Sequence, residues 1–336
     1  MSGYRYCCCI SGYWENVVLT GKNLEEAINQ AVSNCYTKNY LRKSVVTCPY
    51  SQRKNTTDNT PAVIHSQIVP GDEIKIFVMI KGGGSENMST LNMLNPSAGE
   101  SGIIDFVIET VKNAGVKPCP PIRVGIGIGG SFEQSAILAK KALLERIKSI
   151  ACLKNELNSE SKLGYEILQK LNDLKIGPMG MGGNLTCYGV NILSKASHIA
   201  SMPVAVNINC HSSRHASCKI VENTIKYNNE DFEYDFKEIS DLNTNIKEID
   251  LNDINAIKSL KTGDEVYLTG TVYTARVAEN KKLVELIKNK EPLPFVLKKK
   301  TIFYAGPCPA TPDEVIGPIG PTTSSRMDKF APVLYD

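Results

Sequence analysis

Hydrophobic side chains along the first two thirds of the chain switch repeatedly between helical and strand-like spacing. Leu24, Ile28 and Val32 repeat at helical spacing behind Asn23, which is a favoured N-cap residue. Helices are predicted over residues 24–36, 102–113, 133–150 and 165–174, and strands over residues 62–69, 73–80, 122–128, 186–193 and 204–208. These elements predict a mixed α/β (α+β) fold.

The pattern weakens near residue 220. Residues 221–253 are rich in Asn, Asp, Glu and Lys, and few apolar side chains interrupt them. Such a composition is typical of a linker with sparse structure. A second β-rich region follows, with strands predicted at residues 265–274 and 301–304 and a helix at residues 281–288. We therefore predict a domain over residues 1–222, a linker over residues 223–245 and a smaller domain over residues 246–336.

Composition and charge exclude several classes of protein. The chain has 336 residues, of which 42% are hydrophobic, so it is long enough to bury a sizeable core. A net charge of +3, with Lys and Glu interspersed, argues against a nucleic-acid or membrane-surface partner. The sequence contains no apolar run of membrane-spanning length and no secretory signal, so we expect a cytoplasmic protein.

The eleven cysteines are irregularly spaced and odd in number, which argues against a secreted disulfide framework. Most of them are expected to be inert core residues. Cys119 lies between prolines that fix its backbone, and Cys210 follows an apolar strand. Neither belongs to a C-x-x-C pair, so spacing alone predicts no zinc site. A buried thiol and a cluster ligand both remain open for these two cysteines.

Two glycine-rich segments are candidates for ligand binding. Gly125, Gly127 and Gly130 fit the dinucleotide pattern G-x-G-x-x-G between a strand and a helix. The acidic residue that should follow, Glu145, falls inside the next predicted helix, which favours a tight strand-to-helix turn or an anion cradle instead. The other segment, residues 82–84, is Gly-Gly-Gly, which lets a ligand approach the backbone closely or simply forms a flexible loop.

Arginines beside clustered hydroxyls form a third candidate. Arg276 follows Tyr-Thr-Ala, and Arg326 follows Thr-Thr-Ser-Ser. A guanidinium group matches the two oxygens of a carboxylate, so both arginines are candidate carboxylate clamps, although surface loops also carry such residues.

Taken in order, these segments resemble class I, iron–sulfur-dependent fumarate hydratases and the similar tartrate dehydratases. The resemblance extends from about Asn16 to residue 328 apart from the linker, and its motifs are residues 40–44, 53–65, 81–89, 117–121, 125–130, 176–183, 202–211, 268–276, 304–309 and 320–328. It implies a larger iron–sulfur hydro-lyase domain and a smaller β-type domain of swivelling β/β/α architecture. The implied reaction is the reversible hydration of fumarate to malate, with tartrate or mesaconate as alternative small dicarboxylate substrates.

The resemblance also assigns roles to individual residues. The family binds a [4Fe–4S] cluster through three cysteines, and Cys119 and Cys210 match the second and third of them. The fourth iron is open and acts as a Lewis acid. Thr322 matches the hydroxyl proposed as catalytic base, and His198 matches a substrate-binding histidine. The substrate-binding positions are Arg42, Gly83, Gly84, Arg276 and Arg326. An intact enzyme of this kind is expected to be a homodimer.

The start of the chain departs from the family. The first cluster cysteine belongs to a Cys-Gln-Asp-Thr-Gly motif, and residues 1–14 stand in its place. Back-translation of residues 1–14 with suitable synonymous codons gives a second reading frame that encodes Cys-Gln-Asp-Thr-Gly-Ile-Ala-Val-Val-Phe-Leu-Asp-Ile-Gly, the expected family strand. We therefore predict that these residues are translated out of frame, and sequencing the gene tests this. Cys7, Cys8 and Cys9 are then not evolved ligands.

Two alternatives to an active hydro-lyase follow. The resemblance places a further catalytic lysine beyond Asp336, so the β-type domain is expected to be incomplete and the chain to be an inactive fragment or an interaction remnant. A dinucleotide-binding oxidoreductase is disfavoured, because the family resemblance accounts for the same glycines.

Overall fold

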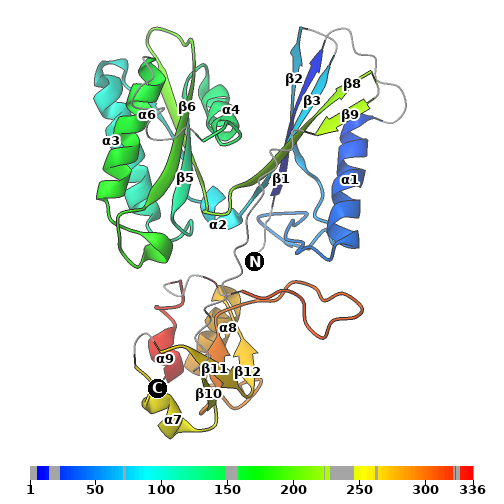
Figure 1. The fold of residues 1–336 in the computed structure, drawn as a ribbon, viewed down its shortest axis with the longest axis vertical. Helices are drawn as coiled ribbons and strands as arrows, with labels where there is room; N and C mark the ends of the chain where they lie inside the picture. The colour runs from blue at the N-terminus through cyan, green and yellow to red at the C-terminus, as the bar shows by residue number, and fades with distance from the viewer. Residues whose placement is uncertain are drawn as a thin grey trace. The chain divides into compact units, whose positions relative to one another are not determined.

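The computed structural model describes residues 23–70, 73–147, 158–222, 224–227, 246–261, 264–320, 322 and 326–335, together with the backbone of residues 6–14. The chain forms two compact units, Gly3–Asn228 and Asn229–Asp336 (Figure 1). None of the described helices is long and apolar enough to cross a membrane.

The larger unit contains two sheets, and the first has five strands in the order β2-β1-β3-β8-β9. Its strands are β1 (Tyr6–Trp14), β2 (Val63–Val69), β3 (Ile74–Lys81), β8 (Arg214–Val221) and β9 (Thr224–Tyr227). Helix α1 (Leu24–Lys38) begins as predicted at Asn23, whose side chain accepts a hydrogen bond from the Glu25 amide at 2.9 Å. Its apolar face, with Val32 and Tyr36 buried, packs against Ile64 and Val78 of this sheet.

The second sheet has four strands in the order β4-β7-β5-β6. Its strands are β4 (Thr90–Leu94), β5 (Ile122–Gly129), β6 (Cys187–Lys195) and β7 (Met202–Asn209). β5 and β6 are parallel, whereas β7 runs antiparallel to both β5 and β4. The principal core of the unit lies between this sheet and the helices α3 (Gly99–Ala114) and α6 (Ser159–Asp173), and it includes Val107, Ile126 and Ile167, each 0% exposed.

Helix α4 (Phe132–Ala142) covers the opposite face of the second sheet (Figure 1). The glycines of β5 make this packing possible. A Cβ atom on Gly125 would lie 2.2 Å from the Ala139 carbonyl oxygen, and one on Gly127 would lie 2.0 Å from the Ser135 carbonyl oxygen. Both glycines therefore let the backbone of α4 rest directly on β5. This contact explains the G-x-G pattern without a dinucleotide.

Short elements connect the main ones in the larger unit. Lys81 ends β3, and helix α2 (Gly83–Glu86) follows after Gly82. A 3-10 turn, Pro96–Ala98, precedes α3, and a second, Pro178–Gly180, lies between α6 and β6. A flexible loop was one of the two expectations for the Gly-Gly-Gly segment, which instead opens the one-turn helix α2.

The smaller unit consists of short elements. They are β10 (Lys247–Asp250), α7 (Ile254–Lys258), β11 (Val266–Thr269), β12 (Val272–Thr274), α8 (Val277–Lys288), β13 (Thr301–Phe303) and α9 (Ala331–Tyr335). β10 pairs in parallel with β11, and β12 pairs in parallel with β13. Val284, Met327 and Phe330 form its buried cluster. Tyr273 and Phe295 stack with ring centroids 4.2 Å apart.

Two predicted helix boundaries were wrong. The helix expected over residues 133–150 ends at Ala142 among the described residues, and the Arg123 guanidinium donates to the Glu145 carbonyl beyond its end. α6 begins at Ser159, six residues before the predicted start at residue 165, because the Asn158 side chain caps it by accepting from the Ser161 amide at 2.7 Å. The stretch expected to have sparse structure, residues 221–253, contains the short strands β9 and β10, and most of the predicted linker, residues 223–245, lies outside the described residues, so its limits stay a prediction.

Candidate functional site

Cys119 and Cys210 meet at one end of the second sheet. Cys119 precedes β5 and Cys210 follows β7, and the antiparallel pairing places Arg123 opposite Asn209. The backbone amide of His211 donates to the Cys119 carbonyl oxygen at 3.4 Å, and His211 Nδ1 lies 3.3 Å from the same oxygen. The structure therefore brings together two cysteines that lie far apart in the sequence.

The backbone at Cys119 is unusual. Its φ angle is +59°, in the left-handed region that a residue with a Cβ atom seldom adopts. The Cys119 amide donates to the Val116 carbonyl at 3.0 Å, and the Met179 amide donates to the Pro120 carbonyl at 2.8 Å. Strained backbone held by such contacts is typical of functional sites. The sequence motif Pro-Cys-Pro-Pro is thus clamped from two sides.

The second glycine-rich loop supplies one of these clamps. A Cβ atom on Gly177 would lie 1.8 Å from the Gly182 carbonyl oxygen, and Gly177, Gly180 and Gly182 all have positive φ angles. The loop folds tightly enough for its Met179 amide to reach the carbonyl of Pro120. These glycines serve to shape the wall beside Cys119.

The two site cysteines differ from the buried cysteine on β6. Cys119 and Cys210 are half-buried, and Cys210 Sγ lies 3.1 Å from Ser212 Oγ. Cys187 is fully buried, and burial raises the pKa of its thiol to about 12. Because the thiolate is the metal ligand, Cys187 is suited to the core and not to a metal site.

Lys81 ties the Gly-Gly-Gly segment to the strand that leads to Cys210. Its side chain is 1% exposed, and Nζ donates to the Ile208 carbonyl at 2.5 Å and pairs with Glu86 at 2.9 Å. Burial lowers the pKa of Lys81 to about 8, against the opposing effect of Glu86. The turn at Gly82 and the start of α2, with Gly83 buried, are therefore fixed beside the end of β7.

Glu86 balances two cations. It pairs with Lys81 at 2.9 Å and with Lys140 of α4 at 2.7 Å. Burial alone would raise the pKa of this carboxyl group, but Lys81 and Lys140 outweigh burial and lower it to about 2. The ion network joins β3, α2 and α4 behind the cysteine end of the sheet.

Strand β1 begins at the same end of the larger unit. Tyr6 pairs with Lys81, and Cys7, Cys8 and Cys9 pair with Ile80, Met79 and Val78. Residues 1–5 lie outside the described residues. Within the described part, no three His, Cys, Asp or Glu side chains gather as metal ligands. The two cysteines therefore match two of the three thiolate positions that the resemblance implies for a cluster.

His198 lies at the other end of β7. Its Nδ1 accepts from the Ala200 amide at 3.2 Å in an exposed turn that precedes the strand. The eight residues of β7 separate this turn from Cys210, which corresponds to about 26 Å of strand. The fold of one chain therefore does not bring His198 to the two cysteines.

The remaining predicted residues lie in loops. Arg42 is half-buried in the connection between α1 and β2. In the smaller unit, Arg276 and Thr322 lie against one segment, because the Thr322 amide donates to the Tyr304 carbonyl at 2.8 Å and a Cβ atom on Gly306 would lie 2.9 Å from Arg276 Nε. Arg326 is half-buried and directly precedes the fully buried Met327.

Comparison with known proteins identifies the class. The profile of the family described as fumarate hydratase (Fumerase) matches residues 8–219, and that described as fumarase C-terminus matches residues 220–336. The chain belongs to the class I fumarate hydratase family, whose relatives include tartrate dehydratase alpha subunits. The named relatives are fumarate hydratases and tartrate dehydratases, which are enzymes of the hydro-lyase class.

Individual relatives include both fumarate hydratases and tartrate dehydratases. The chain is 50% identical over 148 residues to a putative L(+)-tartrate dehydratase subunit alpha of Methanocaldococcus jannaschii, covering 44% of this chain and 50% of that one. It is 28% identical to the anaerobic class I fumarate hydratase of Escherichia coli, covering 94% of this chain and 60% of that one. It is 33% identical to an Escherichia coli L(+)-tartrate dehydratase subunit alpha, and the match covers 59% of this chain and 64% of that one. The chain thus spans between half and two thirds of the length of these relatives.

Proposed function

We propose that this chain binds a [4Fe–4S] cluster through Cys119 and Cys210 and takes part in the reversible hydration of fumarate to malate. The observation that supports this most is the meeting of the two cysteines at the ends of β5 and β7, joined by the hydrogen bond from the His211 amide to the Cys119 carbonyl. Chance would seldom bring together two half-buried thiols from distant segments, one of them on a strained, clamped turn.

The cluster, when bound, would supply an open iron that acts as a Lewis acid toward a substrate oxygen. Cys119 and Cys210 would provide two thiolate ligands. The third ligand is left unassigned, because residues 1–5, which precede β1 and its pairing of Tyr6 with Lys81, contain no cysteine. The Gly82–Gly84 backbone would leave room for a substrate, because glycine has no Cβ atom to obstruct it.

The remaining roles concern charge and protons. Arg42, Arg276 and Arg326 would together hold the two substrate carboxylates through their N–H donors, which neutralises charge that builds up on an enediolate-like intermediate. Thr322 would accept the proton removed from carbon during dehydration. A threonine hydroxyl is a weak base, so this role requires neighbours that favour its deprotonated form. His198 would bind substrate only from a different chain, since β7 separates it from the cysteines of its own.

Tartrate is the second candidate substrate. The 50% identity to a putative tartrate dehydratase alpha subunit favours it, whereas the coverage of 94% of this chain by a fumarate hydratase favours fumarate. Both substrates are small dicarboxylates, so the same arginines would serve either. We infer further that the protein acts in the cytoplasm as a homodimer.

Anaerobic reconstitution with iron and sulfide tests the proposal. We expect the purified chain to retain iron and to show the visible absorbance of a cluster. Cys119→Ser and Cys210→Ser should each lose it, whereas the exposed Cys35→Ser is the matched control and should retain it. Equal iron content in all four proteins would disprove the assignment of the ligands.

Activity is tested on the same preparation. Loss of ultraviolet absorbance by fumarate, compared with formation of oxaloacetate from tartrate, distinguishes the two substrates. A chain that binds the cluster and turns over neither substrate would support the inactive-fragment alternative.

A further inference from the structure

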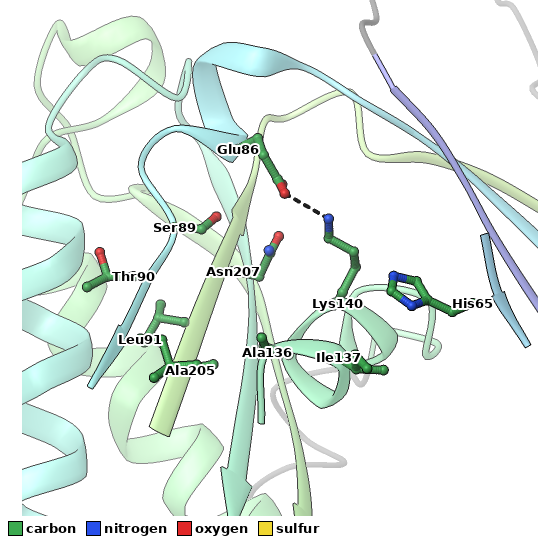
Figure 2. Close-up of a pocket in the computed structure, with 12 residues that line it drawn as sticks. His65, Glu86, Ser89, Thr90, Leu91, Ala136, Ile137, Lys140, Ala205 and Asn207 are labelled. Atoms are coloured by element: carbon green, nitrogen blue, oxygen red, sulfur yellow. Dashed lines mark hydrogen bonds and ion pairs between the residues drawn. The ribbon is translucent and has the colours of Figure 1, made fainter. Parts of the chain in front are cut away.

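A pocket lies in the larger unit, between its two sheets. It has a volume of about 410 Å³, within the range of small-molecule sites. Its walls come from β2, α2, β4, α4 and β7, which contribute His65, Glu86, Leu91, Lys140 and Asn207 among others (Figure 2). Neither cysteine lines it.

The pocket has a polar end and an apolar end. Figure 2 shows Glu86, Ser89, Lys140 and Asn207 around one part of it, and Leu91, Ala136, Ile137 and Ala205 around the other. Such division is characteristic of sites for amphipathic small molecules, in which a few polar groups fix orientation and apolar surface supplies affinity.

The polar end carries excess positive charge. Lys140 lies 2.7 Å and Lys81 lies 2.9 Å from the carboxylate of Glu86, so two ammonium groups share one carboxylate. Lys141 adds a further cation nearby, with Nζ 2.7 Å from the amide oxygen of Gln67 on β2. Burial, followed by the nearby Lys140 and Lys141, lowers the pKa of His65, which favours its neutral form. An anion would complete the charge balance at Lys140.

Asn207 supplies an unused acceptor. It is 7% exposed, and among the described residues its Oδ1 is buried and accepts no hydrogen bond. A buried oxygen without a donor is destabilising, and such groups in native proteins call for an explanation. Figure 2 shows the amide pointing toward the Glu86–Lys140 ion pair. A ligand hydroxyl beside the anionic group would supply the missing donor.

The neighbouring hydroxyl of Ser89 is already engaged. Ser89 Oγ accepts from the Ile208 amide at 3.2 Å and lies 3.5 Å from the Ser85 carbonyl. It therefore forms part of the wall and leaves the new contacts to Lys140 and Asn207.

We propose that this pocket binds a 2-hydroxy acid with an apolar side chain. Its carboxylate pairs with Lys140, its hydroxyl donates to Asn207 Oδ1, and its side chain lies over Leu91 and Ile137. A 2-hydroxy acid carries the carboxylate and the hydroxyl on adjacent carbons, which suits the two facing polar groups. This site is separate from the proposed cluster site, so its occupation depends on neither iron nor turnover.

Calorimetric titration of the purified chain with 3-phenyllactate tests the proposal. Two analogues serve as matched probes: 3-phenylpropionate lacks the hydroxyl group and lactate lacks the ring. We expect 3-phenyllactate to bind, 3-phenylpropionate to bind about fivefold to tenfold more weakly because one hydrogen bond is lost, and lactate to bind more weakly still. Failure of 3-phenyllactate to bind at millimolar concentration, or equal binding of all three, would overturn the proposal.

Two variants locate the bound probe. Ala136→Trp fills the pocket from α4 and should abolish binding, whereas Ala27→Trp places the same side chain on the exposed face of α1, away from the pocket, and should leave binding unchanged. Asn207→Leu should weaken the binding of 3-phenyllactate about fivefold to tenfold and leave the binding of 3-phenylpropionate unchanged. Equal binding by the two tryptophan variants, or equal weakening of both probes by Asn207→Leu, would contradict the assignment. Because these measurements involve neither cluster nor activity, they stand or fall independently of the hydratase proposal.

Discussion

Lys81 is a buried cation whose partners come from two directions. Its ammonium group donates to the Ile208 carbonyl two residues before Cys210, and it pairs with Glu86 two residues after the Gly-Gly-Gly segment. A buried charge is tolerated only when it is paired and hydrogen-bonded. Lys81 therefore positions both the backbone of the glycines and the strand that presents Cys210.

Substitution of Lys81 by methionine is expected to destabilise the larger unit by about 3 kcal/mol. The change leaves a buried carbonyl without its donor and Glu86 with one cation in place of two, and breaking a buried pair from one side is costly. Urea denaturation monitored by circular dichroism measures the loss in the free energy of unfolding. Lys75→Met is the control on the same strand: Lys75 lies 3.8 Å from Glu73 with its side chain 37% exposed, so its removal should cost under about 1 kcal/mol. Equal losses would contradict a structural role for Lys81.

The carboxyl group of Glu86 should make stability depend on acidity. Burial raises its pKa, but Lys81 and Lys140 outweigh burial and hold the pKa at about 2, below the unfolded value of about 4.3. Its contribution is therefore complete above about pH 5 and is lost as pH falls toward 2. At pH 6 the free energy of unfolding of the wild-type protein should exceed that of Glu86→Gln by about 2 kcal/mol. Urea titrations at pH 3 should show a smaller difference between the two proteins. A gap independent of pH would refute this.

Sequence alone indicated some site residues and missed others. Cys119 and Cys210 stood out because prolines and a strand end surround them, and the structure brings them together. Lys81 and Asn207 did not stand out, although both lie within the motifs quoted for the family resemblance. Their importance comes from contacts between segments far apart in the chain, such as Lys81 with Ile208, and local periodicity carries no record of those contacts.

At the scale of elements, the packing of α4 on β5 depends on absent side chains. A Cβ atom on Gly127 would lie 2.0 Å from the Ser135 carbonyl oxygen and 2.5 Å from the Ala139 amide nitrogen. Backbone atoms cannot rotate away as side chains can, so the whole helix has to move. Overpacking of this kind is destabilising even for one methyl group.

Gly127→Ala is therefore expected to destabilise the larger unit by about 2–3 kcal/mol. Gly164→Ala, on α6 across the same sheet, is the matched control, because its new Cβ atom would lie 3.8 Å from Ile192 Cδ1, an ordinary contact. Alanine in a helix interior is favoured over glycine, so this variant should gain about 0.5–1 kcal/mol. Thermal melting compares the two. A stable Gly127→Ala protein would show that α4 does not rest on β5 as described.

The order of elements was largely predictable and their limits were not. Strong periodicity identified α1, α3, β5 and β7, whereas the predicted helix over residues 133–150 ends at Ala142. Arg123, buried at 1% exposure, donates to the Glu145 carbonyl, which ties the chain after α4 to the start of β5. β8 was missed because it begins with Arg214 and His215 and shows no clean alternation of buried and exposed positions. The end of α4 and the presence of β8 both depend on contacts with segments far away in the sequence, such as the pairing of β8 with β3.

At the scale of the whole molecule, each unit has a core of its own. In the larger unit, the main cluster contains Val107, which is 0% exposed, among residues of α3, α6 and the second sheet. In the smaller unit, Met327 is 0% exposed and packs with Val284 and Phe330. A domain with its own hydrophobic core is expected to unfold as its own cooperative unit.

Differential scanning calorimetry is therefore expected to resolve two transitions, each sensitive to one core. Val107→Ala should lower the melting temperature of one transition by about 5 °C or more, because a cavity in a buried core costs about 2–5 kcal/mol. Met327→Ala should lower the melting temperature of the other transition by at least as much. The smaller unit has the smaller entropy of unfolding, so the same loss of free energy shifts its melting temperature further. The two variants serve as controls for each other, since each leaves the opposite core unchanged. If both substitutions shift the same transition by the same amount, the two units unfold in a single cooperative transition, and the prediction of independent unfolding is wrong.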